Sequence, residues 1–359
     1  MDNAISLRQY LVLLFVALLS PLVKLIPGGL AAQAGTGAWL STLLLLLPAL
    51  AVVWLAAYLS RGLPEKEGLG ELLCRCLGQR LGRVLCGVFG VWLLLLSCLT
   101  LRLGVERLTS TIYPNTEMGL FFLAVLTIEW WLGKQKLPVL ARVGQIFFFA
   151  VVLTLALVLV MGVSRIHIYN VWPVWFQDLP SVAGATVPAL GVLGTGVGTL
   201  FCFGQVTDRR DGRRLALGWT AALCLTLAAL SFVVLGVFGP TVVQRLQIPF
   251  FSLAKEVSVE GAVERLEPLV VTMWVFTDVV LLGLLLRSAG RALTLAVGGR
   301  EQQSLTPLLL LVLPGAYLAA GSFFALERSY EMWFLWGDLA LFYGVPLAAG
   351  IIGKCRGVL

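Results

Sequence analysis

The sequence carries little charge for its length. Of its 359 residues, 13% are Asp, Glu, Lys or Arg and 59% are hydrophobic, which gives a mean hydropathy of +0.95. Soluble domains carry about 25% charged and about 45–50% apolar residues. This composition excludes a soluble globular protein and indicates an integral membrane protein.

Residues that bind metals or transfer protons are scarce. The only histidine is His167. The pair Cys74 and Cys76 is predicted on the opposite side of the membrane from His167, so these residues cannot complete a four-ligand site. The remaining cysteines fall in apolar segments or near the predicted reducing face, which makes a disulfide framework unexpected. The sequence contains no hydrolytic triad and no phosphate-binding loop. We therefore expect no metal site, no cofactor and no enzymatic activity.

Long apolar segments occupy most of the chain. A membrane-spanning helix needs about 20 mainly apolar residues. Ten segments meet this requirement: residues 7–33, 37–60, 83–107, 117–133, 140–163, 182–205, 215–239, 262–287, 304–325 and 331–353. The sequence therefore predicts an all-α membrane protein with ten transmembrane helices in a single permease-like domain over residues 1–359.

The basic residues are distributed unevenly between the two predicted sides. Most of the 26 lysines and arginines lie at the termini or in the loops on the same side as the termini. Basic loops stay in the cytoplasm, so both termini are predicted to be cytoplasmic. The net charge of +7 then reflects membrane topology, and we expect no nucleic-acid partner.

Two apolar segments are interrupted at corresponding positions in the two halves of the chain. The first segment contains Ser20, Pro21 and Pro27-Gly28-Gly29, and the sixth contains four glycines between positions 191 and 198. Transporters built from inverted repeats bind small solutes at such paired breaks. A five-plus-five inverted repeat, with halves near 1–165 and 178–353 and with broken helices 1 and 6, is therefore predicted.

Each break allows two interpretations. Pro21 removes a backbone hydrogen bond, so the backbone of Pro21, Leu22, Val23 and Lys24 either unwinds to meet a solute or forms a kink healed by neighbouring helices. The glycines of helix 6 either unwind it or let another helix approach closely. If helix 6 unwinds, Gly194, Thr195 and Gly196 offer amides and a hydroxyl to a carboxylate.

Asp278 is the most informative ionisable residue, because it lies near the middle of the eighth apolar segment. A charge exposed to lipid there is costly, so this carboxyl must face the protein interior. It either binds a proton, a cation or a solute ammonium group, or it pairs with Lys24 or another buried donor. Arg102 and Glu106 are spaced i, i+4, which favours an ordinary ion pair.

Two further stretches have amphipathic spacing. Residues 67–81 place leucines at helical spacing among charges, which is typical of an interfacial helix or of a solvated loop helix. Residues 243–263 mix aromatic and charged side chains before the eighth segment. We expect the second stretch to cap an outward-facing vestibule.

Two groups of residues resemble the spore-germination permease family, the B subunits of germinant receptors within the amino acid/polyamine/organocation superfamily. The first group lies around the start of the chain and comprises Ile5-Ser6, Gln9, Ala34-Gly35 and Ala38-Trp39-Leu40. The second, more specific group leads into the eighth segment and comprises Pro249, LAKEVSV at 253–259, ERLE at 264–267 and Trp274-Val275.

The resemblance implies a subunit of the spore inner membrane that recognises an amino acid or a similar nutrient. It also implies two protein partners, an A-type membrane subunit and a C-type lipoprotein. The family's ligand pocket lies among helices 1, 3, 6 and 8, which here correspond to Pro21, Leu22, Val23, Lys24, Leu101, Arg102, Gly194, Thr195, Gly196, Thr277 and Asp278. Relatives often carry a lysine a few residues after the tryptophan of helix 8, whereas this chain has Asp278 and then Leu281 and Leu282.

Three functions are consistent with these features. A nutrient sensor would bind a zwitterion and shift between two states. A proton-coupled amino-acid transporter would use the same core, with Asp278 cycling between its protonated and ionised forms. A scaffold for a membrane complex would bind no solute.

Overall fold

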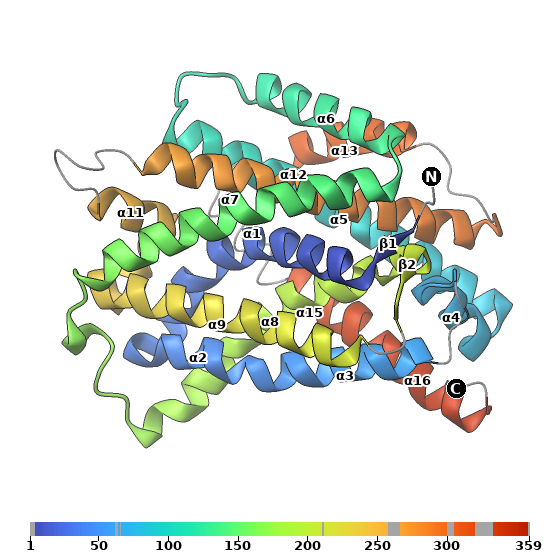
Figure 1. The fold of residues 1–359 in the computed structure, drawn as a ribbon, viewed down its shortest axis with the longest axis horizontal. Helices are drawn as coiled ribbons and strands as arrows, with labels where there is room; N and C mark the ends of the chain where they lie inside the picture. Colours follow the sequence, from blue (N-terminus) through green and yellow to red (C-terminus); the bar gives the residue numbers. More distant parts are fainter. Residues whose placement is uncertain are drawn as a thin grey trace.

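The computed structural model describes residues 4–61, 64, 66–209, 212–257, 266–299, 305–319 and 333–357. Helices run roughly side by side through the molecule, and both chain termini lie at the same end (Figure 1). The elements are β1 (Ile5–Ser6), α1 (Leu7–Ala34), η1 (Gly35–Gly37), α2 (Ala38–Leu44), α3 (Leu46–Arg61), α4 (Leu69–Leu77), α5 (Gln79–Thr111), α6 (Met118–Lys134), α7 (Leu137–Val163), η2 (Ile168–Asn170), η3 (Phe176–Asp178), α8 (Leu179–Gly198), η4 (Thr199–Gln205), β2 (Val206–Thr207), α9 (Arg213–Phe238), α10 (Pro240–Val243), α11 (Pro249–Glu256), α12 (Glu267–Ala296), α13 (Thr306–Leu318), α15 (Leu335–Leu339), η6 (Ala340–Gly344) and α16 (Val345–Cys355).

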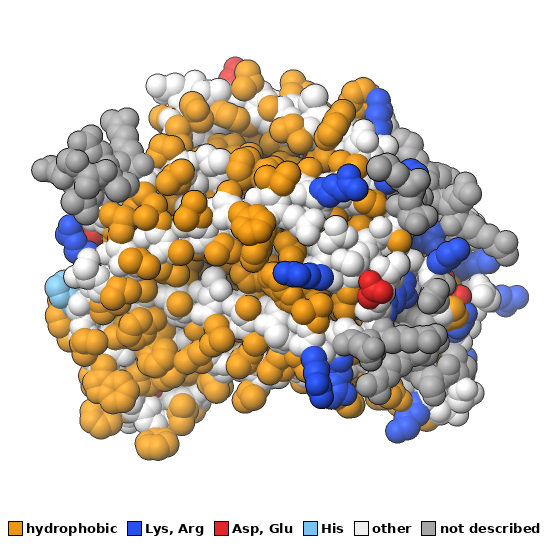
Figure 2. Space-filling model, viewed as in Figure 1, with side chains coloured by type: hydrophobic (Ala, Val, Ile, Leu, Met, Phe, Trp, Pro, Cys, Tyr) orange, Lys and Arg blue, Asp and Glu red, His pale blue; other side chains and the backbone are white. Residues whose placement is uncertain are grey.

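The prediction of an all-α membrane protein is confirmed. Among the described residues, eight helical stretches are long and apolar enough to cross a membrane. The fourth and ninth predicted spans correspond to the shorter helices α6 and α13, and residues 320–325 of the ninth lie outside the described residues. Apolar side chains cover most of the visible surface, and Lys and Arg gather at the end that holds both termini (Figure 2). The inverted repeat stays a prediction.

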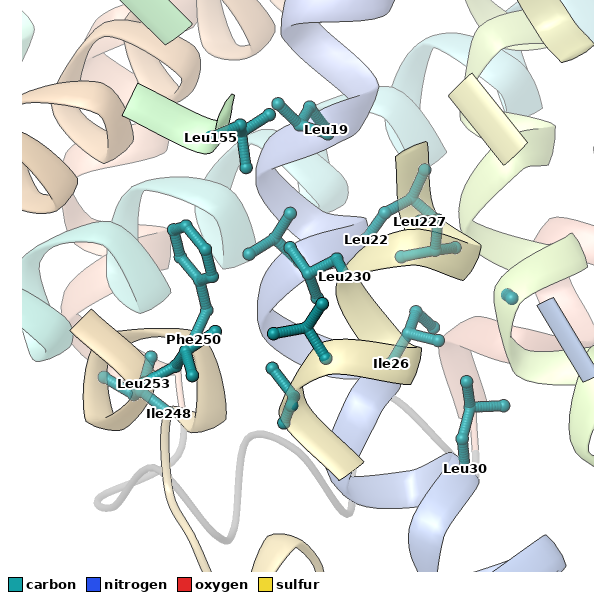
Figure 3. Packing of buried hydrophobic residues seen from close by; sticks show 14 of the residues in the cluster. Leu19, Leu22, Ile26, Leu30, Leu155, Leu227, Leu230, Ile248, Phe250 and Leu253 are labelled. Carbon is teal, nitrogen blue, oxygen red and sulfur yellow. The ribbon is translucent and has the colours of Figure 1, made fainter. Parts of the chain in front are cut away.

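Helix α1 occupies the centre of the structure and is buried on several sides. It packs against α7, α8, α9 and α12. One face contributes Leu19, Leu22, Ile26 and Leu30 to an apolar core shared with α9 and α11 (Figure 3). This burial stabilises the helix independently of its local sequence, since packing supplies most helical stability in proteins.

Of the two interpretations of the helix 1 break, the unwound segment is wrong and a continuous helix supported by its neighbours is confirmed. α1 continues from Leu7 to Ala34 with Pro21 and Pro27 inside it. A proline removes only one backbone hydrogen bond, and membrane helices tolerate that loss where neighbouring helices pack against them. The side chains of Leu19 and Leu22, which flank Pro21, are fully buried in the apolar core, so packing holds the helix on both sides of the proline.

Helix 6 also remains wound at its glycines. α8 is helical through Gly198, and the chain then tightens into the 3-10 helix η4. The glycines instead allow close approach: a Cβ at Gly194 would lie 2.7 Å from Cε2 of Tyr343, and one at Gly191 would lie 2.5 Å from Cδ1 of Leu335. Of the two interpretations of these glycines, the unwound turn is wrong and the close approach of another helix is confirmed, because they serve the contact with α15 and η6.

A short parallel strand pair joins the start of α1 to the chain after η4. Ile5 pairs with Val206 and Ser6 pairs with Thr207. One helical turn further along, the Tyr10 hydroxyl lies 2.7 Å from Oγ1 of Thr199. This pairing could not be predicted, because strands of two residues have no detectable periodicity.

Both amphipathic stretches contain helices that pack on the protein. In α4, the side chains of Leu69, Leu72 and Leu73 are buried, and the helix lies against α5 and α16. In the second stretch, α11 buries Phe250 and Leu253, whereas residues 258–263 lie outside the described part of the chain.

Candidate functional site

Three charged side chains and one serine meet inside the protein at the junction of three helices, where Asp278 is partly buried and the others are buried. α1 contributes Ser20 and Lys24, α5 contributes Arg107, and α12 contributes Asp278. We call these four residues the ionic cluster. Nη2 of Arg107 donates to Oδ2 of Asp278 at 2.6 Å, and both Lys24 Nζ and Ser20 Oγ donate to Oδ1. The interpretation in which Asp278 pairs with Lys24 is thus confirmed.

Helical spacing explains how the cluster forms. Ser20 and Lys24 are one turn apart on α1, and both contact Asp278 of α12. Leu19, Leu22 and Ile26 belong instead to the apolar core that α1 shares with α7, α9 and α11, where Leu19 lies beside Leu155 (Figure 3). Gly104 lets α5 approach α12, since a Cβ there would lie 3.0 Å from Oδ2 of Asp278. The α5–α12 contact therefore depends on a missing side chain at this height.

Arg107 is held by more than its ion pair. Its Nε donates to the carbonyl of Leu103 at 2.9 Å, and its guanidinium carbon lies 5.4 Å from the centre of the Trp274 ring. Trp274 in turn contacts Phe251 of α11, at 5.5 Å between ring centres. The aromatic pair covers the ionic cluster on the side of α11 and favours the cation electrostatically.

A narrow cleft opens beside the ionic cluster, between α5 and α12. It encloses about 420 Å³, including its open side. Its polar lining comes from Thr100, Arg107, Trp274 and Asp278, and apolar side chains of α5, α6 and α12 complete it. Ligand sites are commonly concave and mostly apolar with a few polar groups, and this cleft has that composition.

The structure brings together only some of the residues predicted to bind a ligand. Lys24 and Asp278 meet, Leu101 lines the cleft, and Arg102 pairs with Glu106 at 3.2 Å as expected. Thr277 is fully buried and donates to the carbonyl of Trp274 at 2.9 Å.

The residues predicted from the helix 6 break lie elsewhere. Gly194, Thr195 and Gly196 belong to the continuous helix α8. Gly194 faces Tyr343 of η6, and a Cβ at Gly196 would lie 3.2 Å from Cδ1 of Leu18 on α1. These positions pack helices together and contribute no group to the ionic cluster among the hydrogen bonds and ion pairs of the described residues. Whether any predicted position contacts solute stays a prediction.

The sequence interpretation missed Arg107. This residue sits at the end of an apolar segment, where arginines commonly extend toward the membrane surface, and its neighbours Arg102 and Glu106 formed a self-sufficient pair. One signal was available: Arg107 follows Gly104 by three positions, so both lie on the same helical face.

No grouping in the described ranges suggests a metal centre. Within them, no three His, Cys, Asp or Glu side chains gather closely enough to hold a metal ion. The ionic cluster contains one carboxylate against two cations, a combination that repels metal ions.

The chain matches known proteins over most of its length. A family model described as "Spore germination protein" matches residues 4–314. The chain belongs to the spore germination permease family. Spore germination protein KB of Bacillus subtilis (strain 168) is 23% identical over 270 residues, which cover 73% of this chain and 70% of that protein. The putative spore germination protein YfkT of the same organism is 22% identical over 246 residues, or 68% of this chain and 66% of that protein.

Family membership accounts for the two sequence groups that resembled it. Both groups lie within the matched residues 4–314, one around α1 and one before and within α12. Trp274, which belongs to the second group, is the residue that covers Arg107 in the ionic cluster. The residues that resemble the family therefore include one that lines the candidate site.

Proposed function

We propose that this protein is the nutrient-sensing subunit of a spore germinant receptor, with an amino acid as its ligand. The observation that carries the proposal is the buried ionic cluster, which opens on the cleft between α5 and α12 in a member of a spore germination family. Buried ionisable groups within membrane spans mark functional sites by default, because their burial costs free energy that packing alone does not repay.

The cluster also suits a switch. Asp278 joins α1 to α5 through Lys24 and Arg107, so a solute that competes for one of these cations changes how the two helices are held. A ligand shifts a two-state equilibrium only by its differential affinity for the states. In this proposal, an A-type membrane subunit and a C-type lipoprotein read out the shift.

The proposed location is the spore inner membrane or the cell membrane, with both termini in the cytoplasm. The gathering of Lys and Arg at the end that holds the termini supports this orientation (Figure 2). The ionic cluster then lies in the outer half of the membrane, since Arg107 is about one turn from the far end of α5.

The experiment uses spores of the native host that lack the gene. Release of dipicolinic acid and uptake of labelled solute are scored across a panel of amino acids, sugars and nucleosides. Loss of release to an amino acid with unchanged uptake supports the sensing role. Normal release to every nutrient contradicts it.

A proton-coupled amino-acid transporter is the second candidate. Glu129 of α6 favours this function. Its side chain is only 2% exposed, and its Oε1 has no hydrogen-bond partner among the described residues. A buried carboxyl of this kind is suited to carrying a proton. Normal germination with reduced, pH-dependent uptake in the deletion strain would establish transport.

A further inference from the structure

Two hydrogen-bond donors at the edge of the ionic cluster, one on Arg107 and one on Trp274, have no acceptor in the described part of the protein. Nη1 of Arg107 and Nε1 of Trp274 are both buried and have no hydrogen-bond partner in the described part of the protein. Arg107 and Trp274 are each 2% exposed, and both line the cleft. Buried donors are nearly always satisfied in native proteins, so two orphans on adjacent side chains indicate a missing acceptor.

The charges of the cluster point to the same conclusion. Lys24 and Arg107 supply two positive charges, and Asp278 supplies one negative charge, which leaves one positive charge in excess. The neighbouring pair Arg102 and Glu106 is neutral by itself. An uncompensated charge within a membrane span is strongly unfavourable, so the site favours an anionic occupant. A water molecule would satisfy the donors and leave the charge in place.

Asp278 is already occupied by protein donors. Its Oδ1 accepts from Ser20 and Lys24, and its Oδ2 accepts from Arg107. A solute ammonium group would have to displace these donors and would meet two cations. The site therefore lacks a hydrogen-bond acceptor and a negative charge, and an anionic group supplies both.

We propose that the cleft between α5 and α12 recognises the carboxylate of its solute, held by Nη1 of Arg107 and Nε1 of Trp274. The arrangement suits a carboxylate, whose oxygens accept from a guanidinium edge with strong, charge-assisted bonds. This inference rests on the proposed function only in taking the same cleft as the solute site. Asp278 is then a positioning residue that orients Arg107 and does not contact the solute.

The burial of both donors restricts how a solute can reach them. Because each atom is buried in this conformation, a solute carboxylate reaches them only when α5 and α12 separate beside the cleft. The solute would thus bind a widened state more tightly than the state described here. Such a difference in affinity is what a sensor requires.

The test uses the purified full-length chain in lipid nanodiscs, with thermal unfolding as the readout. The probes are a panel of amino acids, the carboxamides of those amino acids, glucose and inosine. We expect every stabilising probe to carry a carboxylate, and we expect its carboxamide to bind at least about tenfold more weakly, which corresponds to the loss of one hydrogen bond to a charged group. Stabilisation by glucose or inosine, equal stabilisation by the carboxamide, or no stabilisation by any amino acid would overturn the inference.

Variants assign the interaction to the two donors. Trp274→Phe removes the orphan N–H and reduces the indole to a smaller phenyl ring that still places an aromatic face beside Arg107, and we expect it to bind the carboxylate about tenfold more weakly. Arg107→Lys keeps the charge but loses the forked geometry, and it should weaken binding further. Trp54→Phe is the matched control, since Trp54 is exposed on α3 away from the cleft. Unchanged affinity in Trp274→Phe would contradict the assignment.

The inference and the proposed function can fail separately. If carboxylates bind and Trp274→Phe weakens binding, while spores lacking the gene germinate normally, the inference holds and the sensing role fails. If those spores lose their response to a nutrient but the purified chain binds that nutrient equally well as its carboxamide, the sensing role holds and the inference fails.

Discussion

Lys24 and Asp278 of the ionic cluster and the glycines of α8 were all predicted from sequence to bind a ligand, but the two regions are built in opposite ways. In the first, charged side chains from α1, α5 and α12 meet inside the protein. In the second, Gly191 and Gly194 remove side chains so that α15 and η6 can approach α8. Within a membrane, a buried charge demands a polar partner, whereas a glycine is satisfied by an apolar contact. A charge within an apolar segment therefore predicts its buried surroundings in this chain better than a glycine does.

The largest effect is expected where the ionic cluster loses its only anion. Asp278→Asn leaves Lys24 and Arg107 as two buried cations without a counter-charge. Removing one partner of a buried ion pair costs about 3–5 kcal/mol. We expect little folded protein in the membrane, measured as the monodisperse fraction after solubilisation and by thermal unfolding.

A double variant separates charge from shape at the same site. Lys24→Met combined with Asp278→Asn leaves one cation, which restores the net charge of the wild-type cluster. We expect this double variant to recover much of the folded protein that Asp278→Asn loses. If both variants are equally depleted, the charge balance is not what stabilises the three-helix junction.

The difference between the two regions also explains what sequence reasoning could predict. Apolar segment length located the helices, because bilayer thickness fixes it. The cost of burying Asp278 predicted an inward-facing, paired carboxyl. In contrast, Pro21 and Gly194 show only that a backbone bond or side chain is missing. Whether the chain unwinds or packs there depends on partners distant in sequence, such as Tyr343, and Arg107 was missed for the same reason.

The second effect tests the packing region. In Gly194→Ala, the new methyl group would meet Cε2 of Tyr343 at 2.7 Å and Cβ of Phe342 at 3.2 Å. Overpacking of this kind costs about 1–3 kcal/mol. We expect a lower thermal unfolding temperature and, once folded, unchanged solute preference.

Gly184→Ala provides the control in the same helix. A Cβ at Gly184 meets nothing within 4 Å, so this substitution should be neutral or slightly stabilising, because alanine favours helix more than glycine does. A changed ligand preference in Gly194→Ala, with Gly184→Ala unaffected, would show that α8 contacts solute and would restore the interpretation that the structure argues against.

A third and smaller effect concerns the link between the two regions. The Tyr10 hydroxyl lies 2.7 Å from Oγ1 of Thr199, where α1 meets η4. Tyr10→Phe removes this buried hydrogen bond, and we expect a loss of about 0.5–1.5 kcal/mol in the free energy of unfolding. Thr199 keeps a bond to the carbonyl of Gly196, so it is not left unsatisfied.

A double-mutant cycle with Thr199→Val isolates that bond. If the two hydroxyls interact, the combined loss should be smaller than the sum of the single losses, as expected for residues in contact. Additive losses would indicate that α1 and η4 are joined mainly by the strand pair between Ile5 and Val206.

The smallest effect tests whether α4 stays packed beside η4. Burial raises the pKa of the Cys74 and Cys76 thiols, whereas Cys355 is exposed near the chain end. The thiolate is the reactive form, so a raised pKa lowers the thiolate fraction at neutral pH, and reactivity increases as the pH rises toward the pKa.

In variants that each keep one of these cysteines, we expect a maleimide at pH 7 to label Cys355 first and Cys76 last. Raising the pH to about 8.5 should accelerate labelling of Cys74, but Cys76 is fully buried and should remain slow because access also limits it. Equal labelling of Cys76 and Cys355 at pH 7 would mean that α4 detaches from the protein. The packing around η4, which follows the glycine-rich helix α8, would then be looser than the packing around the ionic cluster.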